Sequence, residues 1–179
     1  MVSLAVLFYM FVFIFALIGG IRGWAKEVTA TFSVFLALFV LSVMQSFIPA
    51  VDAYLKNSPI ESQVTFRMLV LGVIVFVGYQ TPNLPAFIQN QHFKRGQMQD
   101  VILGFLIGAF NGYMIFGSLW YFIHSGGYPF DYMLAPIAGT KAGEAALQII
   151  PLLPPAWLVA PGIYFAIAVS FMFVLMVFI

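Results

Sequence analysis

Long apolar stretches constrain this chain more than any other feature of its sequence. Four of them, residues 2–21, 28–48, 101–123 and 160–179, match the roughly 20 apolar residues that an α-helix needs to cross the hydrocarbon core of a bilayer. A fifth stretch, residues 64–79, is shorter and contains Arg67, whose long side chain can extend to the membrane interface. The sequence therefore predicts an all-α, polytopic transmembrane helical bundle with five crossings.

The composition supports a membrane protein and excludes other classes. Hydrophobic residues make up 63% of the chain and charged residues 7%, whereas charged residues make up about 25% of a typical soluble domain. A net charge of +1 is too small for the basic surface that grips nucleic acid, so we expect no nucleic-acid partner. Because residues 1–10 carry no charge, we interpret the first stretch as a retained span and not as a secretory signal peptide.

The basic residues of the loops predict the orientation. The loops after the first and third spans carry two each, Arg22 with Lys26 and Lys94 with Arg95, and the other two loops carry one each, Lys56 and Lys141. By the positive-inside rule the richer loops face the cytoplasm, so the N-terminus is expected outside and the C-terminus inside. We expect a multi-pass protein of the cell inner membrane.

The predicted spans divide the chain into three parts. Residues 1–123 form a four-span core, residues 124–159 form a Gly/Pro-rich outer segment, and residues 160–179 add a transmembrane helix. Within the outer segment only residues 141–150 can form a helix of any length, so we expect a compact re-entrant or surface-lying cap. Residues 81–99 of the third loop are predicted to form either a short amphipathic helix on the inner leaflet or an irregular loop.

Small residues recur at helical spacing in the fourth span. Gly104, Gly108 and Gly112 drift by only about 40° per step around a helix, and Asn111 falls close to the direction of Gly104. Such a glycine zipper lets another transmembrane helix approach closely. We interpret Asn111 as an interhelical hydrogen-bonding residue, and its alternative role is as part of a polar path through the protein.

Charged residues gather at the first cytoplasmic turn and at the start of the fourth span. Arg22, Gly23, Lys26 and Glu27 are predicted to form a tight turn in which glycine allows the reversal and the basic residues set the topology. Asp100 stands directly before the fourth span, where a carboxylate can cap the first helical turn. A second hypothesis pairs Asp100 with Arg22 or Lys26 across the inner surface.

The residue types of catalytic and metal sites do not gather in this sequence. His92 and His124 fall in different loops without an acidic pair, and the chain has no Cys, so we expect no metal site. His124 could ligate a tetrapyrrole within a larger pigment or haem complex, although a solvated polar residue is the simpler interpretation. No Ser–His–acid arrangement is present, so we expect no enzyme. Only Arg67 intrudes into a span, which makes a transporter the weaker hypothesis.

Two segments resemble the colicin V production protein family of small bacterial inner-membrane proteins. Residues 20–27, with Arg22 and Gly23 followed by an aromatic, a basic and an acidic residue, are similar to the family's first cytoplasmic turn, and residues 100–112 are similar to its Asp-led, glycine-stepped fourth helix. The resemblance covers about residues 1–125 and implies a non-enzymatic protein of envelope integrity or secretion. The chain departs from the family in lacking a basic residue at Asn111, an Arg beside Asp100 and an acidic residue near the start of the first span, and in adding a fifth span.

These observations leave three functional hypotheses. The first is a non-enzymatic membrane protein that packs its helices against itself, against partner helices and against membrane lipids. The second is an accessory subunit of a larger energy-converting, photosynthetic or secretion complex, in which the same faces contact partner helices, lipid, quinone or pigment. The third, a small transporter or channel, is weaker because buried ionisable residues are few. No cofactor is predicted outside the second hypothesis.

Overall fold

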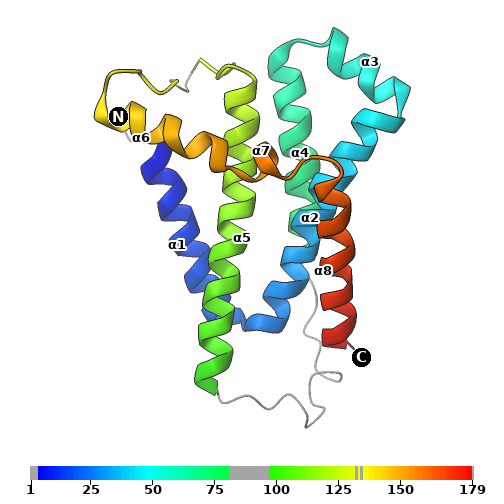
Figure 1. Cartoon of the computed structure of the whole chain (residues 1–179), viewed down its shortest axis with the longest axis vertical. Coiled ribbons are helices and arrows are strands. Elements are labelled where there is room, and N and C mark those ends of the chain that lie inside the picture. The colour runs from blue at the N-terminus through cyan, green and yellow to red at the C-terminus, as the bar shows by residue number, and fades with distance from the viewer. Residues whose placement is uncertain (1–3, 81–96, 132, 134, 179) are drawn as a thin grey trace.

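The computed structural model describes residues 4–80, 97–131, 133 and 135–178, and every regular element in these ranges is a helix. Four helices are long and apolar enough to cross a membrane: α1 (Leu4–Arg22), α2 (Trp24–Phe47), α4 (Ile60–Tyr79) and α5 (Gln97–Ser125). They run side by side with α8 (Gly162–Phe178), which is apolar but has only 17 residues (Figure 1). The all-helical class is thus confirmed for the described residues, and four helices have the length and apolar composition of a membrane span.

Three helices, α2, α4 and α5, begin earlier than their apolar stretches suggest. Only Gly23 separates α1 from α2, so α2 starts four residues before the predicted span and includes Glu27 in its first turn. Similarly, α4 begins at Ile60 and α5 at Gln97, because polar residues continue a helix as readily as apolar ones do. The short helix α3 (Pro49–Asn57) was not predicted, and it begins where Pro49 occupies the first helical position.

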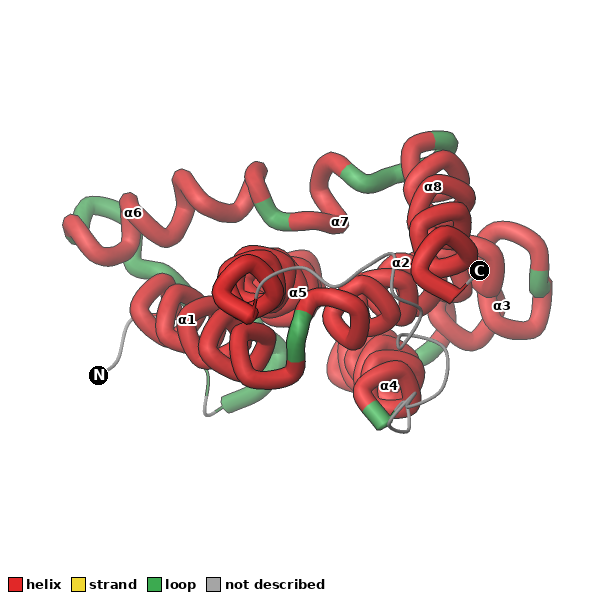
Figure 2. The backbone as a smooth tube through the Cα atoms, turned by 90° about the horizontal axis from the view of Figure 1, so that it is seen from below, coloured by secondary structure: helices red, strands yellow, loops and turns green. Residues whose placement is uncertain are grey.

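Two pairings organise the bundle. α1 packs along α5, which is the most extensive contact between any two described helices, and α2 lies at the centre against α4, α5 and α8. Figure 2 shows α2 between α5 and α8, with α4 on one side of this row. The larger hydrophobic core lies where α2, α4 and α5 meet, around Val34, Leu71 and Met114, which are all fully buried.

The outer segment forms a transverse strap across one side of the bundle. It comprises α6 (Lys141–Ile149), the short helix η2 (Ile150–Leu152) and α7 (Pro154–Trp157), which run across α1 and α5 toward α8 (Figures 1 and 2). The helix α6 lies where the sequence predicts one, and the Thr140 side chain caps it by accepting a hydrogen bond from the Gly143 amide at 3.1 Å. A second core of Phe8, Trp120, Ala146 and Leu153 holds the strap against α1 and α5.

Candidate functional site

Five side chains from four helices form a buried polar cluster at the junction of α1 and α2: Arg22, Glu27, Thr31, Tyr79 and Asn111. Glu27 and Asn111 are completely buried, with 0% exposure. The Arg22 Nη1 donates to Glu27 Oε1 at 2.6 Å, and the Glu27 Oε2 accepts from Asn111 Nδ2 at 2.9 Å and from the Tyr79 hydroxyl at 3.2 Å. Both carboxylate oxygens are therefore bonded, as a carboxylate removed from water requires.

The single-residue turn at Gly23 creates this arrangement. Gly23 has a φ of +84°, a backbone conformation that glycine adopts without steric cost. The reversal brings Arg22, the last residue of α1, against Glu27 in the first turn of α2. Because the positive charge sits at the C-terminus of one helix and the negative charge at the N-terminus of the next, both also interact favourably with the helix dipoles.

Arg22 also secures the end of α4. Its Nη2 donates to the backbone carbonyl of Tyr79 at 3.1 Å, and its guanidinium carbon lies 4.4 Å from the centre of the Tyr79 ring. A guanidinium in this position bonds a carbonyl that the helix end leaves without an intrahelical partner, and it gains a cation–π contact. One side chain thus joins α1, α2 and α4.

Asn111 joins α5 to the same cluster. Its Nδ2 donates to the backbone carbonyl of Glu27 at 3.0 Å as well as to the carboxylate, and its Oδ1 lies 2.7 Å from the Thr31 hydroxyl. The Thr31 hydroxyl also lies 2.9 Å from the Glu27 carbonyl, so its one proton serves two acceptors. Asn111 is therefore an interhelical hydrogen-bonding residue in this structure.

The glycine ribbon, Gly104, Gly108 and Gly112, lies against α1. A Cβ added at Gly108 would collide with the carbonyl oxygen of Phe15 and would lie 2.9 Å from the Gly19 Cα, and one added at Gly112 would lie 2.8 Å from the Phe15 Cβ. At Gly104 a Cβ would meet the carbonyl of Gly19. The ribbon faces α1 while Asn111 faces α2. The glycines and the asparagine of α5 therefore contact two different helices.

The predicted roles of Asp100 need correction. Asp100 lies in the first turn of α5, because the helix begins at Gln97, and so it is not the residue that precedes the helix. Arg22 forms its ion pair with Glu27 and not with Asp100. The pairing of Asp100 with Lys26 stays a prediction. The Asp100 Oδ2 lies 3.1 Å from the place that a Cβ on Gly23 would take. Lys26 is half-buried in the first turn of α2.

His124 and Arg67 lie away from the polar cluster. His124 is in the last turn of α5 and not in a loop, with its ring edge-on to Tyr128 at 5.7 Å, while His92 lies outside the described residues. Burial raises the pKa of the Tyr128 hydroxyl above its ordinary value. The Nδ1 of His124 and the Nε of Arg67 are buried without a hydrogen-bond partner in the described structure. Among the described residues, no three His, Asp or Glu side chains gather as metal ligands would.

Sequence reasoning missed the burial of Glu27 and the participation of Tyr79. It assigned Glu27 to an exposed turn and named Arg67 as the one charge within a span. The spacing of Glu27 and Thr31 is a signal that could have corrected this, because residues four apart share one face of a helix. Tyr79 carried no such signal, since it contacts the cluster from a helix 52 residues further along the chain.

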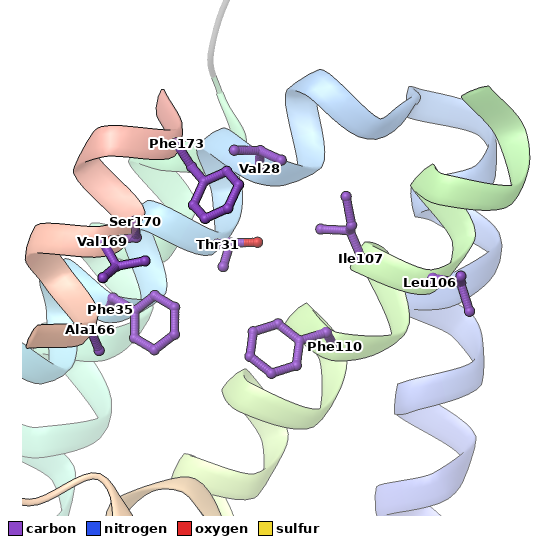
Figure 3. Close-up of a pocket in the computed structure, with 10 residues that line it drawn as sticks. All are labelled: Val28, Thr31, Phe35, Leu106, Ile107, Phe110, Ala166, Val169, Ser170 and Phe173. Atoms are coloured by element: carbon purple, nitrogen blue, oxygen red, sulfur yellow. The ribbon is translucent and has the colours of Figure 1, made fainter. Parts of the chain in front are cut away.

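A lateral cavity of about 420 Å³ lies beside the polar cluster, between α2, α5 and α8 (Figure 3). Thr31 belongs to both, with its side chain on the cavity wall and its hydroxyl bonded to the cluster. The other lining side chains are apolar except Ser170. The cluster's ionised groups do not line the cavity.

Comparison with family models, with curated proteins and with solved structures gives no match to this chain. The resemblance to the colicin V production protein family therefore stays a prediction from residues 20–27 and 100–112.

Proposed function

We propose that this chain is a non-enzymatic integral membrane protein that acts by packing its helices against copies of itself or against partner membrane proteins. The observation that carries this proposal is the polar cluster. Its charged side chains, Arg22 and Glu27, form hydrogen bonds that hold α1, α2, α4 and α5 together. Ionisable groups that serve transport usually face a water-filled path. Here the carboxylate is fully buried, and the adjacent cavity has an apolar wall.

The outer faces of the bundle provide the surface for such packing. Large apolar side chains are exposed on α1, α4 and α8, including Phe13, Leu69, Val73, Phe165 and Met172. In a membrane these faces contact lipid or other helices. The same faces support the second candidate function, an accessory subunit of a larger membrane complex. An envelope role of the colicin V production type, in the inner membrane, agrees with both candidates.

The absence of cysteine makes the packing proposal directly testable. In native membranes, single Cys variants at the exposed positions Val73 on α4 and Phe165 on α8 are expected to form disulfide-linked adducts, either with a second copy or with a partner. The matched control is Val34→Cys on α2, whose side chain is fully buried and should give no adduct. If neither exposed position gives an adduct of defined mass, the packing proposal is wrong. Specific solute flux through reconstituted liposomes would favour the transporter hypothesis instead.

We further propose five crossings, with α8 as the fifth, the N-terminus outside and the C-terminus inside. The support is that α8 lies alongside α2 although it is shorter than the other four helices. Its 17 residues span about 26 Å at 1.5 Å per residue, so the bilayer would thin slightly around it.

The orientation has its own test. Ser58→Cys, between α3 and α4, is expected to react with a membrane-impermeant maleimide added to intact cells or spheroplasts, whereas Gln99→Cys, in the first turn of α5, should react only after the membrane is opened. The two sites lie at opposite ends of the bundle (Figure 1). The reverse labelling pattern would show that the orientation is inverted.

A further inference from the structure

The cavity between α2, α5 and α8 is enclosed on three sides by helices. α2 packs against α5 on one flank and against α8 on the other, and the cavity fills the space between these two flanks. Phe35 of α2, Phe110 of α5 and Phe173 of α8 provide aromatic walls, as Figure 3 shows. A volume of about 420 Å³ is within the range of roughly 300–1,000 Å³ that is typical of small-molecule sites.

The lining excludes ions, water clusters and polar solutes. Of the ten lining residues only Thr31 and Ser170 are polar, and both hydroxyls already donate within the protein. Ser170 donates to the Ile167 carbonyl at 3.0 Å, and Thr31 lies within hydrogen-bonding distance of Glu27 O and Asn111 Oδ1. A buried water needs two to four polar partners, and a charged group needs more. The cavity therefore suits a hydrocarbon ligand.

We propose that this cavity binds one acyl chain of a bilayer phospholipid. Because α2 and α5 are long and apolar enough to cross the membrane, a cavity between them lies beside the acyl chains of the bilayer. Left empty, it would deprive its aromatic and aliphatic walls of dispersion contacts, which a flexible methylene chain restores. A second copy of the protein fits less well, since a helix with its side chains is about 10 Å wide and is too bulky for this space.

Charged residues of α2 and α5 lie at the level of one end of the cavity. Val28, which lines the cavity, lies within one turn of Lys26, and Asp100 lies beside Gly23 at the same end of the bundle. Charges of both signs thus stand at the membrane level where the headgroup of a chain in the cavity would lie. Neither side chain lines the cavity, so these charges mark the level of the headgroup and not a binding site for it.

Native mass spectrometry of the full chain, extracted from nanodiscs of phosphatidylethanolamine and phosphatidylglycerol, tests the proposal. The wild-type protein is expected to retain one phospholipid per chain. Ala166→Phe, which fills the cavity from α8, should lose this lipid, whereas Ala168→Phe, at an exposed position on the same helix, should retain it. Retention by Ala166→Phe, or loss in both variants alike, would overturn the proposal.

The same spectra distinguish the alternative occupant. A wild-type mass corresponding to two chains, reduced to one chain only by Ala166→Phe, would show that a second copy fills the cavity and would refute lipid binding. Circular dichroism verifies that each variant keeps its helices. If Ala166→Phe does not fold, Val169→Phe is the second variant. Val169 also lines the cavity, three residues further along α8, and its replacement by Phe should cause the same loss of lipid. Failure of lipid binding leaves the adducts at Val73 and Phe165 unaffected, so it is distinguishable from failure of the packing proposal.

Discussion

Replacing Glu27 with alanine is expected to destabilise the fold by about 3–5 kcal/mol, the usual cost of removing one partner from a buried ion pair. The variant leaves the Arg22 guanidinium, with a side chain only 19% exposed, without its carboxylate, and it removes an acceptor from Asn111 and Tyr79. The measurement is the free energy of unfolding from SDS titration in mixed micelles. The matched control is Asp52→Ala, which breaks the exposed pair with Lys56 and should cost about 0.5 kcal/mol or less.

A double variant separates the cost of an unpaired charge from the value of the pair itself. Arg22→Met with Glu27→Leu removes both charges and keeps apolar bulk, so it should recover most of the stability that either single variant loses. A double-mutant cycle should show strong coupling between the two positions. Simple additivity of the two single effects would contradict the assignment of Arg22 and Glu27 as a buried pair.

Replacing Gly108 with leucine is expected to separate α1 from α5 and to cost about 3 kcal/mol or more, at the upper end of the usual range for overpacking. The reason is that the groups nearest to a side chain at Gly108 are backbone atoms, the Phe15 carbonyl oxygen and the Gly19 Cα, and backbone cannot rotate aside. The same titration measures this cost, and proximity labelling between single Cys residues on α1 and α5 reports the separation.

Gly72→Leu on α4 is the matched control for this second prediction. A Cβ at Gly72 would have no heavy atom within 4 Å, so the substitution changes the helix without touching a neighbour. Its stability should stay within about 1 kcal/mol of the wild type, because the better helix propensity of leucine is the main effect. If Gly108→Leu were tolerated as well as Gly72→Leu, the close packing of α1 on α5 would not be a determinant of the fold.

Periodicity and composition predicted the long apolar helices and the glycine ribbon because both are local properties of the chain. The recurrence of Gly104, Gly108 and Gly112 places them on one helical face whatever surrounds that helix. The recurrence could not indicate which helix packs against the glycines, since any transmembrane helix can pack on bare backbone. The structure identifies α1, and it turns Asn111 toward α2.

The errors at the helix ends have a common cause. Apolar stretches mark the part of a helix that faces lipid or core, whereas the hydrogen-bonded helix continues through polar residues such as Glu27, Glu61 and Gln99. Treating the end of the stretch as the end of the helix placed Glu27 in a turn and Asp100 before a helix. The same error hid the buried ion pair, because a charge assigned to a turn was assumed to be solvated.

The sequence by itself determined that this protein is helical and belongs in a membrane, because the length and hydropathy of a segment decide whether it can cross a bilayer. Only the tertiary structure decided what its few polar residues do. Arg22, Glu27, Tyr79 and Asn111 come from four different helices, and they meet only when those helices pack. The cavity likewise exists only because α8 returns to α2 and leaves a space beside α5. Such sites depend on distances between segments, and a local pattern carries no information about those distances.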